Sequence, residues 1–320
     1  MSKASVFTRM KRAYRCQFMH LCTRVLDRLN PEFYYRSPKT ITRLWYGSQK
    51  GFFPRLNHPR DFNEQLMAIN LIAFRDDRMR KIRIQCADKY AVRDYIHSLG
   101  LGEILNECFG VFESFQDIDF NKLPEQFVLK LTNGSGQNYI CRNKLELDLK
   151  ALESRCNAWL AQSSSFGLKT AEWHYSAIKP RIIAEKYLSS LGEDTSLIDY
   201  KFHCINGRIA GILVCYGRKP ELHQGNFDYY DSDWNLTDGI LPQFHKQQRL
   251  IPKPVSFERM KQIVETISQG IDYVRVDLYE IDGAPLFGEM TFTPAGNVMS
   301  KYRQWVMDYF LKVYKETKSV

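Results

Sequence analysis

The sequence has no apolar run long enough to cross a membrane, no CxxC pair and no recognisable signal peptide. A membrane-spanning helix needs about 18 or more consecutive apolar residues, and zinc or redox sites built on cysteine need paired spacing. The eight cysteines are instead scattered along the chain. We therefore expect a cytoplasmic protein with reduced thiols, soluble or peripheral to a membrane.

Two common phosphate-binding motifs are also absent. There is no GxGxxG, and no glycine loop ends in Lys-Ser or Lys-Thr before a helix, which disfavours a Rossmann or a Walker A nucleotide site. No Ser/His/Asp or Cys/His set indicates covalent catalysis, since His203 has no partnered nucleophile in the sequence. A length of 320 residues allows two or three domains or subdomains.

Acidic residues are nearly missing from the first 60 residues, which hold thirteen Lys and Arg against Asp27 and Glu32. The net charge of this segment is +11, so the rest of the chain sums to −2. Apolar residues recur every three or four positions within 5–29, which predicts a basic amphipathic helix. This helix could lie on an anionic membrane surface or pack on the protein's own core. No motif for nucleic-acid binding accompanies the charge, so a nucleic-acid partner is disfavoured.

The remaining pattern predicts an α+β chain. Helices are expected over 61–74, 76–100, 145–176, 256–270 and 300–316, with an interruption at the QSSSFG stretch of the third. Strand patterns dominate from residue 180, and an Asn-Gly turn at 206–207 predicts a hairpin. Its alternation sets Tyr200, Phe202 and Cys204 opposite Lys201, so Lys201 either contacts a phosphate or is a solvated strand lysine.

A second hairpin, at 275–297, places two carboxylates side by side. If 282–284 form a three-residue loop, Asp277 lies opposite Glu289. One face of the hairpin would then belong to the core and carry Val276, Leu278, Leu286, Met290 and Phe292. The other face would carry the polar candidates for a functional site, Arg275, Asp277, Tyr279, Glu289 and Thr291. Like charges directly opposite each other are unfavourable in a sheet, so we expect a cation to bind between the two carboxylates. Mg²⁺ is a suitable cation, since carboxylates bind it in proteins. A solvated hairpin face is the alternative.

Three further stretches carry candidate binding residues. Asn133, Gly134, Ser135 and Gly136 form a glycine loop after Lys130, suited to an anion-binding nest or to a plain turn. A strand turns polar at Glu185 and Lys186, followed by Glu193 and Asp194. Asp231-Ser232-Asp233 could hold a metal on a nucleotide sugar, or form a turn.

Six stretches in order resemble the ATP-grasp superfamily, and within it the branch named for the teichuronopeptide biosynthesis protein TupA, found among bacterial surface-polysaccharide genes. They are DKYAVR (88–93), FVLK before NGSG (127–136), IIAEKYL (182–188), DYKFHCINGRI (199–209), FDYYDSDWNL (227–236) and RVDLYEIDGAPLFGEMTFTPAGN (275–297). The resemblance implies a nucleotide held between two α+β subdomains with antiparallel sheets. It divides the chain into a basic, aromatic N-terminal segment (1–60), a helical subdomain (61–115), a small subdomain with the glycine loop (116–188) and a large subdomain with the metal site (189–320).

The resemblance also implies roles for particular residues, with ATP and Mg²⁺ as cofactors. The ATP site would comprise Lys89, Lys130, Asn133, Gly134, Ser135, Gly136, Glu185, Lys186, Tyr187, Leu188, Glu193 and Asp194. Asp277 and Glu289 match metal ligands, and Thr291 stands where the family pattern has Asn. Arg275, with Lys201, would stabilise charge on the transferring phosphoryl group. Asp231, Asp233, Gly296 and Asn297 are the candidate substrate contacts.

The implied reaction is an ATP-dependent joining of a carboxylate to an amine through an acylphosphate, for example an amino acid to a uronic acid of a surface polysaccharide. No residue can be assigned from the sequence as the base that removes a proton from the amine. Three alternatives stay open: a glycan kinase on the same fold, a glycosyltransferase built on Asp231 and Asp233, and an ATP-binding scaffold without turnover.

Overall fold

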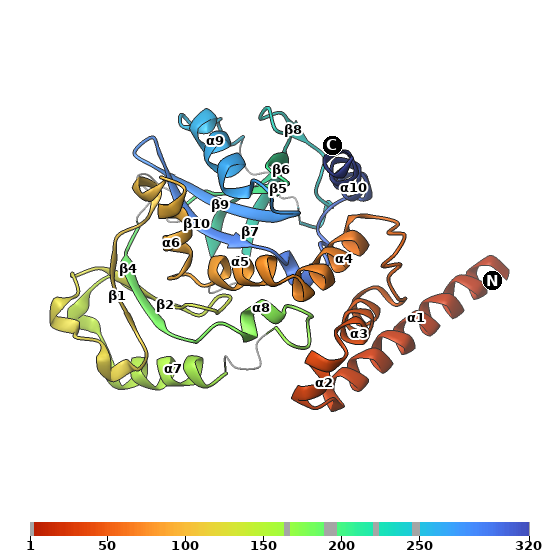
Figure 1. Ribbon diagram of the computed structural model, residues 1–320, viewed down its shortest axis with the longest axis horizontal. Helices are drawn as coiled ribbons and strands as arrows, with labels where there is room; N and C mark the ends of the chain where they lie inside the picture. The colour runs from red at the N-terminus through yellow and green to blue at the C-terminus, as the bar shows by residue number, and fades with distance from the viewer. Residues whose placement is uncertain (1–2, 163–166, 189–196, 220–223, 245–249, 320) are drawn as a thin grey trace.

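The computed structural model describes residues 3–162, 167–188, 197–219, 224–244 and 250–319, which form two antiparallel sheets and the helices around them (Figure 1). The helices are α1 (Lys3–Arg28), α2 (Pro31–Arg36), α3 (Pro38–Lys50), α4 (Phe62–Arg75), α5 (Asp77–Ala87), α6 (Val92–Ser98), α7 (Leu149–Gln162), α8 (Trp173–Ser176), α9 (Phe257–Ser268) and α10 (Gln304–Lys318). The strands are β1 (Cys108–Phe112), β2 (Phe127–Leu131), β3 (Asn138–Cys141), β4 (Ile182–Lys186), β5 (Asp199–Ile205), β6 (Arg208–Lys219), β7 (Gln224–Tyr230), β8 (Leu236–Thr237), β9 (Val274–Ile281) and β10 (Ala284–Thr291). The α+β prediction is therefore confirmed.

The smaller sheet has the strand order β1-β4-β2-β3. Helix α7 packs on it with Leu152 and Cys156, which contact a core that includes Phe127, Leu129 and Ile182. Because β1 pairs with β4, this sheet draws on residues on both sides of the predicted boundary at 115/116.

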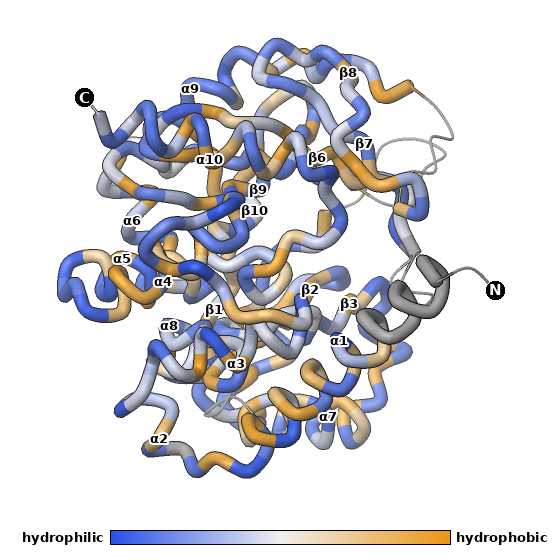
Figure 2. The backbone as a smooth tube through the Cα atoms, turned by 90° about the vertical axis from the view of Figure 1, so that its right-hand side faces the viewer, coloured by the Kyte–Doolittle hydropathy of each residue, from blue (hydrophilic) through white to orange (hydrophobic). Residues whose placement is uncertain are grey.

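The larger sheet has the order β10-β9-β5-β6-β7-β8 and is covered on both faces. Helix α9 packs on one face, where Phe202 and Val276 belong to the same buried cluster as Ile263. Helices α4 and α10 cover part of the other face through Phe62 and Phe310. Figure 2 shows α9 and α10 in the upper part of the molecule and the smaller sheet below them. The predicted alternation along β5 is confirmed, because the side chains of its even-numbered residues lie in the α9 core.

The β9–β10 hairpin corrects the predicted turn and keeps the predicted pairing. Its loop has two residues, Asp282 and Gly283, both with positive φ (52° and 75°), as a type I′ turn requires. This shorter loop shifts the alternation of β10, so Phe287 and not Leu286 lies in the core. A bulge at Gly288 then restores the register, and Glu289 pairs with Asp277. The prediction of a three-residue loop was wrong, but a bulge of one residue compensates for it.

The N-terminal helix forms as predicted and packs on α3 at the edge of the molecule (Figure 1). Cys22 and Leu26 are buried, and Arg15 Nε donates to the Lys50 carbonyl at 2.7 Å. Two residues of the predicted apolar stripe face outward instead, since Tyr14 is 72% and Leu21 54% exposed. None of the helices in the described part of the chain is both long and apolar enough to cross a membrane.

The bulge at Gly288 leads to a testable prediction about side chains at this position. A Cβ there would lie 2.9 Å from the Asp277 carbonyl oxygen, so Gly288→Ala should lower the free energy of unfolding by about 1–3 kcal/mol, measured by denaturant titration. Asp282→Asn is the matched control in the same hairpin, since Asn tolerates positive φ, and it should change stability by less than about 0.5 kcal/mol. A Gly288→Ala protein as stable as the wild type would contradict this account of the bulge.

Candidate functional site

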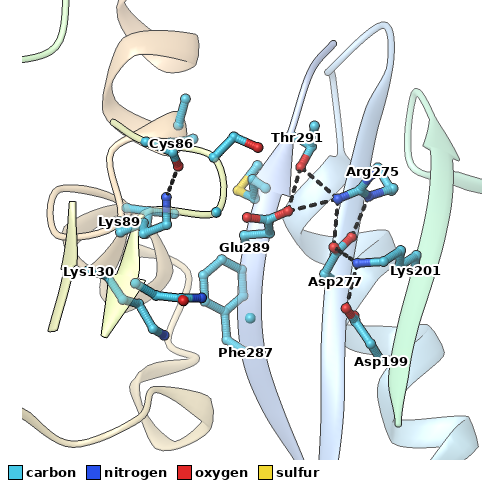
Figure 3. A pocket seen from close by; sticks show the side chains of 18 of the residues that line it. Cys86, Lys89, Lys130, Asp199, Lys201, Arg275, Asp277, Phe287, Glu289 and Thr291 are labelled. Carbon is cyan, nitrogen blue, oxygen red and sulfur yellow. Dashed lines mark hydrogen bonds and ion pairs between the residues drawn. The ribbon is translucent and has the colours of Figure 1, made fainter. Parts of the chain in front are cut away.

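A cleft of about 440 Å³ lies between the two sheets. Lys89 and Lys130 line one wall, while β5, β9 and β10 supply the charged side chains of the opposite wall (Figure 3). The face of the large sheet that α4 and α10 leave uncovered thus becomes one side of the cleft. Several predicted residues that are far apart in the sequence are brought together here: Lys89, Lys130, Lys201, Arg275, Asp277, Glu289 and Thr291.

Asp277 and Glu289 lie side by side on the sheet wall, and Arg275 bridges them. Its guanidinium donates to Asp277 Oδ1 and Oδ2 at 2.6 and 2.7 Å and to Glu289 Oε1 at 2.8 Å. Thr291 Oγ1 also lies 3.1 Å from Glu289 Oε1. Burial raises the pKa of Glu289, but the charges of Arg275, Lys201 and Lys89 outweigh it and lower the pKa to about 2. Glu289 is therefore a carboxylate at any neutral pH.

Lys201 extends this network to residues that the sequence did not single out. Its ammonium donates to Asp277 and, at 2.6 Å, to Asp199 Oδ2, which also accepts from Arg218 Nη2 at 2.7 Å. Burial alone would lower the pKa of Lys201, but the two carboxylates outweigh it and raise the pKa. Asp199 shares the strand face of Lys201 at a spacing of two residues, so the alternation of β5 could have identified it.

Lys89 reaches the cleft because the helix predicted over 76–100 is broken. The Asp88 carboxylate accepts from the backbone N–H groups of Tyr90 and Ala91 at 2.7 and 3.0 Å, which ends α5 and starts α6 after a short turn. The backbone N–H of Lys89 donates to Thr132 O, and its ammonium to Gly134 O at 2.5 Å. The break in the helix therefore allows Lys89 to donate a hydrogen bond to the glycine loop.

The glycine loop joins β2 to β3, as the sequence predicted, and overhangs the cleft. Gly134, Ser135 and Gly136 line the cleft, whereas Asn133 is fully buried behind it. Lys130 donates to Glu185 Oε2 at 2.7 Å, and Arg93 lies 3.9 Å from the other carboxylate oxygen. Arg93 was not predicted, although it ends the DKYAVR stretch.

The strand end at 185–188 has part of its backbone already engaged. Lys186 N–H donates to Glu107 O at 3.0 Å, and Asn106 Nδ2 donates to Lys186 O at 2.9 Å. Leu188 lines the cleft, while Tyr187 is contacted by Arg142 outside it. Glu193 and Asp194 lie outside the described residues.

The four candidate substrate residues are not together. Asp231 accepts from the backbone N–H groups of Asp233 and Asn235 at 2.9 and 2.8 Å, so this stretch is a side-chain-capped turn, and neither aspartate lines the cleft. Gly296 does line it, whereas Asn297 is buried. The expectation that the two aspartates line the substrate end is therefore not met.

Glu172 is a cleft residue that the sequence did not reveal. It lies just before α8 and is 9% exposed, and it accepts from the hydroxyls of Thr170 and Thr293 at 2.6 and 2.5 Å. Burial raises its pKa to about 7. Its stretch of sequence, KTAEWH, has no charge pattern that would have pointed to a site.

The sheet wall suits a hard divalent cation. Asp277, Glu289 and Thr291 offer carboxylate and hydroxyl oxygens, the ligands that Mg²⁺ prefers. The hydrogen bonds that Glu289 accepts from described residues are all at Oε1, and its other oxygen points across the cleft (Figure 3). In the described part of the chain no group of three or more His, Cys, Asp and Glu could hold a metal ion by protein ligands alone.

A family model described as TupA-like ATPgrasp matches residues 71–311. The chain belongs to this family. It is thus an ATP-grasp enzyme, with ATP and Mg²⁺ as cofactors and the fold that the sequence predicted.

The chain is also similar to solved structures, at low identity. A D-alanine–D-alanine ligase from Bacillus anthracis is 14% identical, with 73% of this chain and 69% of that chain covered and a TM-score of 0.43. An L-amino acid ligase from Bacillus licheniformis is 17% identical, with 67% of this chain and 44% of that chain covered and a TM-score of 0.41. A RimK domain ATP-grasp protein from Sphaerobacter thermophilus is 10% identical, with 90% of this chain and 96% of that chain covered and a TM-score of 0.40. The curated proteins contain no match. The family match alone carries the assignment.

The buried charges predict a pH-dependent stability loss in Lys201→Met. Removing the ammonium leaves the Asp199 and Asp277 carboxylates short of a partner, which should cost about 3–5 kcal/mol at pH 7.5. Burial raises the pKa of Asp277 to about 6, so at pH 5 the protonated carboxyl needs no cation and the difference from wild type should shrink. Denaturant titrations at both pH values measure this.

Lys179→Met is the control for that experiment, because the Lys179–Glu113 pair has both side chains 65% exposed and such pairs contribute less than about 1 kcal/mol. An equal loss in the two variants, or a loss in Lys201→Met that does not change with pH, would contradict the charge network.

Proposed function

We propose that this enzyme joins a carboxylate to an amine through an acylphosphate, and that one of the two substrates belongs to a bacterial surface polysaccharide. The observation that carries the proposal is the arrangement of the cleft, with lysines and a glycine loop on one wall and the paired Asp277 and Glu289 on the other (Figure 3). The polysaccharide part rests on the resemblance to the branch named for teichuronopeptide biosynthesis. An amino acid and a uronic acid are the substrates that this resemblance favours.

The residues divide into two groups in this proposal. Lys89, Lys130 and residues 134–136 hold the phosphates, the segment 185–188 receives the adenine, and Asp277, Glu289 and Thr291 hold the metal. Mg²⁺ supplies charge neutralisation on the phosphates when bound. Arg275 and Lys201, which already neutralise the two carboxylates, are placed to stabilise charge on the transferred phosphoryl group.

The chemistry needs positioning and charge more than a nucleophile of the protein. Cys86 also lines the cleft, but burial raises its pKa to about 12, so its thiol stays protonated and unreactive at neutral pH. Phosphoryl transfer to a substrate carboxylate, followed by attack of an amine, requires no covalent enzyme intermediate. The charged walls of the cleft suit this sequence of steps.

Asp277→Asn and Glu289→Gln test the proposal. With ATP, Mg²⁺, hydroxylamine and a panel of uronic acids and amino acids, wild type should release ADP and phosphate and form an acyl hydroxamate. Each variant should lose at least about 100-fold of both activities, because the transition-state charge loses its metal. Product analysis by mass spectrometry measures the hydroxamate.

Asp233→Asn is the control, since the Asp233 side chain is 76% exposed and lies outside the cleft, and it should keep full activity. A phosphorylated sugar without hydroxamate would favour the kinase alternative. Binding of a nucleotide sugar that Asp233→Asn abolishes, with no binding of ATP, would favour the glycosyltransferase.

We also propose that residues 5–29 hold the enzyme on the anionic inner face of the cell membrane. The exposed Tyr14 and Leu21 on a strongly basic segment support this, because apolar side chains among cations favour an anionic lipid surface. Tyr14→Glu/Leu21→Glu should reduce co-sedimentation with phosphatidylglycerol vesicles at least about 5-fold, and 0.5 M salt should weaken wild-type binding.

The control for the vesicle experiment is Leu145→Glu, which changes a side chain 94% exposed on the small subdomain and should leave co-sedimentation unchanged. Vesicles of phosphatidylcholine should retain neither protein. Equal sedimentation of the double variant and wild type would remove the membrane proposal.

A further inference from the structure

Glu172 is the cleft carboxylate that differs from all the others in its partners. Glu185, Asp199, Asp277 and Glu289 each form an ion pair with a Lys or Arg. Glu172 forms none with any described residue; its two oxygens accept instead from the Thr170 and Thr293 hydroxyls. A buried carboxylate without a cation is costly, so this position suits a cation brought by a ligand.

Glu172 lines the same cleft as the proposed metal carboxylates. Thr293, Ala295 and Gly296 line the cleft beside it. Tyr175, from α8, lies close to both Glu172 and Glu289: after burial, the negative charges of these two residues further raise the pKa of its hydroxyl. Tyr175 is therefore neutral, and it lines the cleft together with Glu172 and Glu289.

The loop at 295–297, just after Thr293, has a backbone conformation that residues with a side chain rarely adopt. Ala295, Gly296 and Asn297 have φ values of 51°, 62° and 69°, which is unfavourable for the two residues that carry a Cβ. Trp45 Nε1 donates to Gly296 O at 2.6 Å, and Asn297 Nδ2 lies 3.4 Å from Thr170 O. Trp45 and Thr170 thus hold this loop of small residues at the cleft that Glu172 also lines.

We propose that Glu172 binds the ammonium group of the acceptor substrate and removes its proton. This inference rests on the proposed ligase function. It assigns the base for the amine, which could not be assigned from the sequence. The carboxylate takes one proton from R–NH₃⁺, and the nitrogen lone pair then forms the C–N bond to the acylphosphate carbon. The C–O bond to phosphate breaks, phosphate leaves with the electron pair, and the second N–H proton goes to the phosphate.

A pKa near 7 suits the role of a base at neutral pH. Burial sets this pKa, and the hydroxyls of Thr170 and Thr293 oppose it. Tyr175 on α8 is a neighbouring titratable group, since the charge of Glu172 raises the pKa of its hydroxyl. Amide formation should therefore fall as the pH drops through about 7, because the protonated carboxyl can no longer accept a proton.

Glu172→Gln tests the inference, because glutamine keeps the shape: its amide oxygen can accept from one threonine hydroxyl, and its amide nitrogen can donate to the other. Hydroxylamine is largely uncharged at neutral pH and needs no base, so the variant should form hydroxamate within about 3-fold of wild type. With the uronic acids and amino acids that wild type joins, the variant should lose at least about 100-fold in amide formation. The fall of amide formation below pH 7 should disappear from its residual activity, while the hydroxamate reaction should show no such fall in either protein.

A second measurement does not need the natural acceptor. Glycine and ethylamine, as cationic amines, should inhibit wild-type hydroxamate formation, and their inhibition constants should rise at least about 10-fold in Glu172→Gln. Glu280→Gln is the matched control, since Glu280 accepts from Ser256 N–H and hydroxyl at 2.7 Å and lies outside the cleft; it should behave as wild type.

The outcomes separate this inference from the proposed function. Wild type that makes no hydroxamate would overturn the ligase proposal and the inference with it. Wild type that makes hydroxamate, together with equal inhibition constants and equal amide rates in Glu172→Gln, would overturn the role of Glu172 alone. A parallel loss of hydroxamate and amide in the variant would also overturn it, because it would indicate general damage to the site.

Discussion

The cross-strand pair of Asp277 and Glu289 is the constraint on which the cleft depends. Two carboxylates opposed on neighbouring strands repel each other, and they persist because Arg275 and Lys201 lie between and beside them. Lys201 comes from β5, so neutralising the pair ties the third strand of the sheet to the hairpin. Asp199 and Arg218 then complete a network in which each described charge has an opposite neighbour.

The other wall is arranged by hydrogen bonds that interrupt regular structure. The Asp88 carboxylate ends α5 by accepting from the backbone, and the resulting turn carries Lys89 to the glycine loop. Lys130 is held by Glu185 in the same sheet. Lys89 and Lys130 are thus each positioned by a polar contact of their own wall, and both line the cleft.

A third region joins the N-terminal helices to the site. Trp45 of α3 holds the Gly296 carbonyl, and Thr293 next to that loop holds Glu172. The N-terminal segment therefore supports one part of the cleft lining as well as providing a basic surface. Tyr14 and Leu21 are exposed on α1, whereas Trp45 of α3, the helix on which α1 packs, supports the loop at 295–297.

The sequence by itself determined the α+β class, the glycine hairpin and the pairing of Asp277 with Glu289, because these follow from alternation and turn residues close together in the chain. It also indicated the family through six local stretches. Only the tertiary structure decided the two-residue turn with its bulge at Gly288, the break at Asp88, and the placing of Asp231 and Asp233 away from the cleft. Glu172 belongs to this second group most clearly. Its lack of a cationic partner and its raised pKa come from burial by segments more than one hundred residues apart, and no local pattern encodes them.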